Sequence, residues 1–191
     1  IIITTPFRVK IPSGKFSRLG HIGQSYQITQ WFAKPAVFDK NGWHPMSYLD
    51  QGEFYSEFGN YDVSITLPKN YILMATGDLQ NEEEIDFLNE KAKLTSRLIK
   101  ENKLPVRDSF GRKDMSFPKS SLEKKTLRFV QNNVHDFAWF TDKRYHILKG
   151  EVDVNNRKIT SWALFTNNEA KLWRRSIEYI NDATRYFSKW V

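Results

Sequence analysis

The chain has 191 residues and a net charge of +7, with 40% apolar and 15% aromatic residues. This length suits one domain, or one domain with part of a second, and the apolar share excludes a disordered chain. The absence of cysteine excludes disulfide bonds and thiolate-bound zinc. Because the basic residues are spread along the chain, they favour an ordinary basic surface over a nucleic-acid or membrane-surface site. No apolar run approaches the roughly 20 residues of a membrane span, and no basic-then-apolar leader opens the chain.

The two ends of the sequence read like the interior of a longer chain. Ile1 is not a methionine and opens a strand-like run, and the amphipathic pattern at the other end continues to Val191 without a glycine cap or a proline stop. We therefore expect a fragment of a longer protein.

The first 45 residues contain short strand patterns separated by turns. A strand broken by a proline is predicted for residues 1–9, and another for residues 25–32, in which Gln30 ends one face with a polar side chain. Residues 33–45 predict a short strand and a loop closed by the turn pair Asn41-Gly42.

A longer strand pattern follows an aromatic-rich loop. Residues 61–67 alternate apolar and polar side chains, and residues 71–75 form a second apolar run. Pro68 and two turn residues lie between them, so the two runs predict a half-buried antiparallel hairpin.

The period then changes from strand to helix. Asn81 followed by three glutamates predicts an N-cap, and apolar residues at helical spacing predict a helix over residues 82–101. Residues 103–122 predict a long loop, and residues 80–122 together look like an insertion between two strands.

Strand patterns resume over residues 126–131, 134–140, 145–154 and 159–165. Asn132-Asn133 predicts a turn, and Asn155-Asn156 predicts a type I′ hairpin turn. Asn168 caps a second predicted helix, whose apolar stripe is Leu172, Ile177, Ile180, Ala183, Phe187 and Trp190. These elements predict a mainly β fold, an antiparallel β-sandwich with one inserted helix and a C-terminal helix.

Few residues have a spacing that serves catalysis or metal binding. The histidines are His21, His44, His135 and His146. They lie singly and none has a partner at i, i+4 spacing, so we interpret each as structural rather than as a ligand or base. Glu82, Glu83 and Glu84 could bind a cation, but a helix N-terminus attracts acidic side chains in any case. A carboxylate pair for acid–base work is conceivable among Asp50, Glu53 and Glu57, although their loop setting favours a solvated face.

Aromatic residues cluster in sequence around one loop: Trp31, Phe32, Trp43, Tyr48, Phe54, Tyr55 and Phe58. On a β-sandwich such a cluster can stack sugars or single-stranded nucleic acid, but packing of the core and between domains is the favoured interpretation. No serine or threonine lies in a G-x-S-x-G context. The residues alone therefore predict a non-catalytic β domain.

Four phrases of the sequence carry a resemblance to a known family: TQW at 29–31, GWHP at 42–45, EFGNYDVSITLPKNYILMATG at 57–77 and VHDFAWF at 134–140. In this order they resemble the N-terminal domain of aminopeptidase N-like zinc metallopeptidases, especially those of a bacterial subgroup. The resemblance covers nearly the whole chain and leaves out residues 80–122.

The resemblance implies a saddle-like β-sandwich followed by a zinc-binding catalytic domain. Residues 1–156 are then an N-terminal domain with a truncated start, and residues 157–191 begin the catalytic domain. The H-E-x-x-H and G-x-M-E-N-like motifs of the family are absent here, so no catalytic or metal-binding residue is expected in this chain. The implied cofactor is zinc in the missing domain, and the implied partners are that domain and a peptide substrate, not nucleic acid. The resemblance also favours a periplasmic or other extracytoplasmic location.

Two residues are expected to bind substrate. Gln30 matches the glutamine of the family's T-Q-x-E/Q element, which lies beside the active site and helps hold the amine of the peptide. Phe32 stands where Glu or Gln is expected, and its ring can offer a cation only a π face. The alternatives are a β-sandwich module that binds carbohydrate or an anionic polymer, and a pure interaction scaffold.

Overall fold

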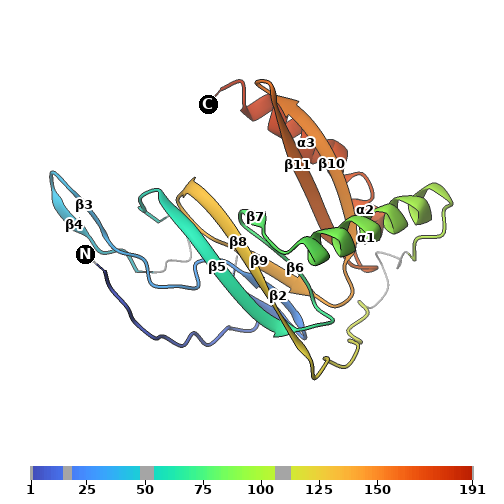
Figure 1. Ribbon diagram of the computed structural model, residues 1–191, viewed down its shortest axis with the longest axis horizontal. Coiled ribbons are helices and arrows are strands. Elements are labelled where there is room, and N and C mark those ends of the chain that lie inside the picture. The colour runs from blue at the N-terminus through green and yellow to red at the C-terminus, as the bar shows by residue number, and fades with distance from the viewer. Residues whose placement is uncertain (1, 15–18, 48–53, 106–112, 191) are drawn as a thin grey trace. The chain divides into compact units, whose positions relative to one another are not determined.

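The computed structural model describes residues 2–14, 19–47, 54–105 and 113–190. Its strands are β1 Gly20–Ile22, β2 Ser25–Ile28, β3 Val37–Asp39, β4 Gly42–His44, β5 Gly59–Pro68, β6 Ile72–Ala75, β7 Asp78–Leu79, β8 Lys124–Val134, β9 Trp139–Asp142, β10 His146–Val154 and β11 Arg157–Phe165. Its helices are α1 Glu82–Lys100, α2 Ala170–Trp173 and α3 Ser176–Phe187 (Figure 1). The strands pair antiparallel, and the predicted mainly β fold is confirmed. The chain forms two compact units, unit 1 over residues 1–80 and 120–143 and unit 2 over residues 81–119 and 144–191.

Two of the sheets in unit 1 share one core. The strand orders are β1-β2-β9-β6 in the larger sheet and β5-β8-β7 in the smaller. The buried residues of the core are Leu67, Tyr71, Leu73, Leu127, Phe129 and Phe137. Phe129 and Phe137 are both 0% exposed, and burial of such a side chain contributes about 1.5–3 kcal/mol. Two antiparallel sheets over one core make a β-sandwich, as the sequence predicts.

The predicted hairpin of residues 61–75 is wrong. β5 pairs with β8 over its whole length, whereas β6 pairs with β9, so the two strands belong to different sheets. Tyr71 N donates to Pro68 O at 3.0 Å in the turn between them. The burial of β6 explains why it is not the outer strand of a half-buried hairpin. Ile72 is 2% and Leu73 0% exposed, and these neighbouring side chains point to opposite faces, so both faces of β6 are covered.

The predicted strand over residues 1–9 is also wrong. Residues 2–12 have no regular secondary structure, and Ile2 and Ile3 are 95% and 82% exposed. Among the described residues no strand runs beside this segment to complete its backbone hydrogen bonds. The next predicted strand is shorter than expected, because β2 ends at Ile28.

Two further turn predictions have different outcomes. Residues 37–44 form the hairpin β3–β4, in which Gly42 adopts φ +101° after the turn. The turn predicted at Asn132-Asn133 is wrong, because β8 continues to Val134. Asn133 has φ +57° and lies where the pairing with β5 shifts register, between Gly59 and Tyr61.

Unit 2 is built on the hairpin β10–β11. Its turn has Asn155 at φ +49° and Asn156 at φ +61°, which confirms the predicted type I′ geometry. The predicted boundary between residues 156 and 157 falls at the tip of this hairpin, so the compact units divide the chain elsewhere.

The helix predicted over residues 82–101 is confirmed as α1, which packs on β10. Asn81 occupies the N-cap position, although its side chain makes no capping hydrogen bond. Leu88 is 1% and Ala92 5% exposed, and the Thr95 hydroxyl accepts the Ile147 N–H at 3.3 Å. The helix of the predicted insertion is therefore part of the packing of unit 2.

The predicted C-terminal helix is broken into α2 and α3 at residues 174–175. Of its predicted apolar stripe, Ile177 and Ile180 pack against the core of unit 2, whereas Leu172, Phe187 and Trp190 are 73%, 63% and 74% exposed. None of the helices in the described part of the chain has the length and apolar character needed to cross a membrane.

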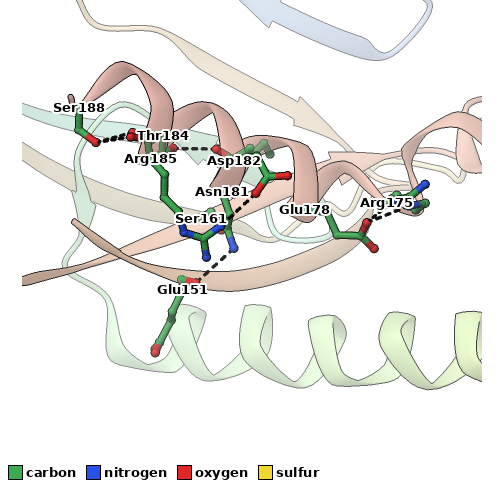
Figure 2. Close-up of polar contacts among 10 residues, drawn as sticks. Glu151, Ser161, Arg175, Glu178, Asn181, Asp182, Thr184, Arg185 and Ser188 are labelled. Carbon is green, nitrogen blue, oxygen red and sulfur yellow. Dashed lines mark hydrogen bonds and ion pairs between the residues drawn. The ribbon is translucent and has the colours of Figure 1, made fainter. Parts of the chain in front are cut away.

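A close approach fixes α3 on the hairpin β10–β11. A Cβ on Gly150 would lie 2.4 Å from Cγ2 of Ile177, so only glycine admits the helix at this distance. Figure 2 shows Asn181 between the two strands: its Oδ1 accepts the Ser161 hydroxyl at 2.7 Å, and its Nδ2 donates to Glu151 O at 3.2 Å. Small residues and one amide thus bring helix and hairpin together.

Candidate functional site

The backbone of Gln30 has an unusual conformation. The preceding strand β2 ends at Ile28, which is fully buried and pairs opposite Trp139 of β9. Gln30 then adopts φ +52°, in the left-handed region, at a cost of about 1–2 kcal/mol for a residue other than glycine. Such strain persists only where the surroundings hold it.

The side chain of Gln30 is unusual as well. Its Oε1 is buried, and it has no hydrogen-bond partner among the described residues. A buried acceptor left unpaired costs about 1–3 kcal/mol. A ligand with an N–H or O–H donor could satisfy this oxygen only if the groups that cover it moved aside.

Trp31 ties the Gln30 loop to the segment before β9. Its Nε1 donates to Phe137 O at 3.0 Å, and its ring lies edge-on to Trp139 with centroids 6.5 Å apart. Because Phe137 is fully buried, this hydrogen bond fixes the loop to the core of the sandwich. The position of Gln30 follows from that anchor.

Phe32 packs inward and already has a cation beside it. Its ring is half-buried and lies edge-on to Trp31 at 5.2 Å and to Tyr61 at 5.8 Å. Lys34 Nζ lies 5.5 Å from the centroid of this ring and 3.0 Å from Asp136 Oδ1. The structure therefore brings Gln30 and Phe32 into one loop, and the cation near Phe32 is the chain's own lysine. Sequence reasoning missed the Lys34–Asp136 pair, because the two residues are far apart along the chain.

A second polar cluster lies on the hairpin β3–β4. Asp39 Oδ1 accepts hydrogen bonds at 2.8 Å from the Asn41 N–H and from His44 Nε2, and the Tyr55 hydroxyl donates to Oδ2 at 3.3 Å. The hydrogen bond from His44, followed by that from Asn41, lowers the pKa of Asp39. The Asp39 carboxylate therefore orients the His44 ring and stabilises the turn between β3 and β4.

The aromatic cluster predicted from the sequence divides into packed and exposed members. Its half-buried members are Trp31, Phe32 and Phe54, and its exposed members are Trp43, Tyr55 and Phe58. Tyr48 lies outside the described residues. Phe38, which sequence reasoning did not include, is 64% exposed and pairs across β3–β4 with Trp43, which is 68% exposed, at a centroid distance of 5.0 Å.

The other histidines have partners within their own units. His21 Nδ1 lies 2.9 Å from Gly23 O, and the His135 ring lies 5.6 Å from that of Phe58. His146 Nε2 lies 2.6 Å from Asn167 Oδ1. Burial lowers the pKa of His146, the bond to Asn167 opposes that change, and the charge of Lys91 adds to it.

Acidic residues do not assemble into a site in the part of the chain that the structure describes. Glu82 and its two neighbours form the first turn of α1. Glu57 is exposed, and Asp50 and Glu53 lie outside the described residues. No three His, Cys, Asp or Glu side chains among the described residues come together as metal ligands.

No protein-family model matches the chain, and neither a curated protein nor a solved structure matches it.

The chemistry available at the Gln30 loop is that of binding. A carboxamide neither gains nor loses a proton near neutral pH, so Gln30 can hold a donor group but cannot act as an acid or base. The rings of Trp31 and Phe32 follow it in the loop, and the Lys34–Asp136 pair lies next to the Phe32 ring.

Proposed function

We propose that the chain is the non-catalytic N-terminal domain of a zinc-dependent, aminopeptidase-like metallopeptidase. The β-sandwich of unit 1 is the leading domain, and the hairpin β10–β11 with the helices after it leads into the catalytic domain. The leading domain packs against the catalytic domain and supplies one wall of the peptide-binding cleft. The phrases at residues 29–31, 42–45, 57–77 and 134–140 support this assignment.

The conformation of Gln30 and the burial of its side-chain oxygen are the observations that support the proposal most directly. Gln30 has a strained backbone and a buried Oε1 that is unpartnered among the described residues, and both are costly. Contacts of the neighbouring Trp31 and Lys34 hold the residue in this conformation. Backbone strain of this kind recurs at binding sites, and the acceptor suits the N–H of a peptide's first residue.

Phe32 has a different role from the one the family motif implies. Its ring is already in contact with the Lys34 ammonium, which is paired with Asp136. Recognition of the peptide's amine from this loop therefore falls to Gln30, and Phe32 forms part of the wall.

Zinc is the cofactor that the proposal requires. The described residues hold no group of three potential ligands that fits the ion. The proposal places the metal and its ligands in the catalytic domain.

The test replaces Gln30 in the complete peptidase. We expect Gln30→Ala to lower kcat/KM for an unblocked peptide about 10- to 100-fold, as loss of a hydrogen bond to a charged group does. Gln27→Ala is the matched control, since Gln27 is an exposed glutamine on β2, and it should leave both kinetic constants unchanged. Unchanged kcat and KM in Gln30→Ala would show that this residue does not bind the peptide.

A second candidate function is a β-sandwich module that binds carbohydrate or an anionic polymer. The exposed Phe38–Trp43 pair favours it, because two neighbouring rings on a strand ribbon can stack on a sugar or a base. Titration of the chain with oligosaccharides and single-stranded DNA tests it. Saturable binding at about 0.15 M salt that is lost in Trp43→Ser would favour this module, and no binding would remove it.

A further inference from the structure

The turn between β3 and β4 holds Asn41-Gly42, the one Asn-Gly pair in the sequence. The side-chain carboxamide of an asparagine can be attacked by the backbone nitrogen of the residue that follows it, which closes a five-membered ring. A side chain on that next residue hinders the attack, and glycine has none. Asn41 is therefore the asparagine of this chain that is most open to the reaction.

The side chain of Asn41 is exposed and is not held in place. Its backbone N–H donates to Asp39 Oδ1 at 2.8 Å, whereas its carboxamide has no hydrogen-bond partner among the described residues. By contrast, Asn60 Oδ1 accepts the Asn133 N–H at 3.1 Å, and the carboxamide of Asn181 is bonded through both its oxygen and its nitrogen. A bonded carboxamide must give up its partner before it reacts, and Asn41 has no such cost.

The backbone of Gly42 leaves room for the attack. It adopts φ +101°, and a Cβ at this position would meet nothing within 4 Å. The pairing of Gly42 with Asp39 across the hairpin opposes the reaction, because the ring can close only when the Gly42 nitrogen is released from the strand. The rate therefore depends on how readily the hairpin opens.

The hairpin β3–β4 is small and is anchored at one end. Its strands have three residues each and form a two-stranded sheet of their own (Figure 1). Val37, at the end remote from the turn, is 2% exposed, whereas Phe38 and Trp43 are 64% and 68% exposed. A two-stranded hairpin is marginally stable in water. The turn end should therefore open at a small fraction of the free energy of global unfolding.

We infer that Asn41 is a site of spontaneous deamidation, at which the chain converts its own turn into a mixture of aspartate and isoaspartate. The Gly42 nitrogen loses its proton to hydroxide and attacks Cγ of Asn41. A bond forms between these two atoms, the Cγ–Nδ2 bond breaks, and Nδ2 leaves as ammonia with a proton taken from water. Water then opens the resulting succinimide at either carbonyl, and no atom is oxidised or reduced. The inference does not depend on the proposed function.

Both products change the hairpin. Each adds a negative charge beside Asp39, whose carboxylate accepts the N–H of Asn41. Isoaspartate also routes the backbone through the side chain and adds one methylene group to it, so β4 is displaced relative to β3. The Phe38–Trp43 pair, with ring centroids 5.0 Å apart across the two strands, should separate. The platform that the second candidate function uses is thus lost as the protein ages.

The test follows the chain during incubation over several days at mildly acidic, neutral and mildly alkaline pH. Mass spectrometry of the tryptic peptide that begins after Lys40 measures deamidation, and isoaspartyl methyltransferase with labelled S-adenosylmethionine counts isoaspartate. Asn102 is the internal control, since it is exposed but is followed by a lysine. Asn41→Gln is the matched variant, because it keeps a carboxamide before Gly42 but would have to close a six-membered ring.

We expect deamidation at Asn41 to be at least about tenfold faster than at Asn102 and to accelerate with pH. Asn41→Gln should reduce methyl incorporation to the background. Because the hairpin opens readily, the rate in the folded chain should lie within about tenfold of that in the urea-unfolded chain. An Asn41 that stays intact in the folded chain while the unfolded chain reacts completely would overturn the inference, and so would equal rates at the two asparagines.

Nuclear Overhauser contacts between the Phe38 and Trp43 rings test the structural consequence separately. Asn41→Asp supplies the added charge without the extra methylene group, so it should keep these contacts, whereas the isoaspartate fraction should lose them. Contacts that persist in the isoaspartate fraction would refute the displacement of β4. Their loss in Asn41→Asp as well would show that the charge, and not the longer backbone, separates the rings.

Discussion

Trp31 is the residue whose contacts hold Gln30 in its strained conformation. Its indole donates a hydrogen bond to Phe137 O and packs against Trp139, so the loop after β2 cannot relax without breaking contacts to the sandwich. Lys34, paired with Asp136, holds the other end of the same loop. Strain at one residue is thus balanced by ordinary contacts at its neighbours.

We expect Trp31→Phe to lower the free energy of unfolding by about 1–3 kcal/mol, because the ring is largely kept while Phe137 O loses its donor. Urea denaturation with an unchanged m-value measures this loss. Trp43→Phe is the control, since that exposed side chain should change stability by less than about 0.5 kcal/mol. Equal effects of the two substitutions would contradict the anchoring role of Trp31.

The site could be predicted from the sequence only in part. The T-Q match selects Gln30, but nothing in the sequence marks its left-handed backbone, because only glycine, asparagine and aspartate commonly signal that conformation. The cation beside Phe32 was not predictable either, since it comes from Lys34 held by a residue near β9. Both features arise from contacts that are remote in sequence.

At the scale of elements, Gly150 determines how closely α3 approaches β10. A methyl group at this position would overlap Ile177 Cγ2 at 2.4 Å, a distance that real Cβ atoms essentially never show. The Ser161–Asn181 hydrogen bond at 2.7 Å depends on the same approach. Glycine is thus required here for packing.

We expect Gly150→Ala to destabilise the chain by about 1–3 kcal/mol through overpacking. In the Ile177→Ala background the added methyl group has room, so the double variant should recover at least about 0.5 kcal/mol relative to the sum of the single changes. Thermal and urea unfolding measure this coupling. Gly59→Ala is the control, since its Cβ would meet Tyr61 Cε2 at an ordinary 3.9 Å. Simple additivity of the two changes would contradict the close approach as the cause.

Elements were predicted more successfully than their pairing. The alternation in β5 and the helical spacing in α1 are local properties, and both elements lie where the sequence places them. Pairing is a property of the fold: Lys69-Asn70 can turn a chain back into a hairpin or across to a second sheet, and here they do the latter. The Asn155-Asn156 turn, by contrast, has a geometry specific enough to predict its hairpin.

At the scale of the whole molecule, the two units are interleaved in sequence. The chain leaves unit 1 after Gln80, returns at Ser120 and leaves again after Lys143. The segment that looks like an insertion in the sequence therefore supplies a packed helix to unit 2, where α1 buries Leu88 and Ala92.

Replacing residues 81–119 by a flexible linker should therefore damage unit 2 selectively. We expect the amides of Ile147 and Leu148 on β10 to lose most of their protection against hydrogen exchange, because their cover is removed. The amide of Phe129 on β8 should keep its protection and serves as the internal control. If β10 stays protected in this variant, the segment is a dispensable insertion after all.

The crossing from β5 to β6 also determines when unit 1 can fold during synthesis. Pro68 pairs with Lys124 and Ile72 with Asp142, so both strands are made long before their partners. The apolar faces of β5 and β6 stay exposed to solvent until the chain has been extended past Asp142. Contacts of such high sequence separation also form slowly. The hairpin β10–β11, joined by two residues, has no such delay. The nascent sandwich is thus exposed to misassociation until β8 and β9 have been made, whereas the hairpin β10–β11 can pair as soon as it is complete.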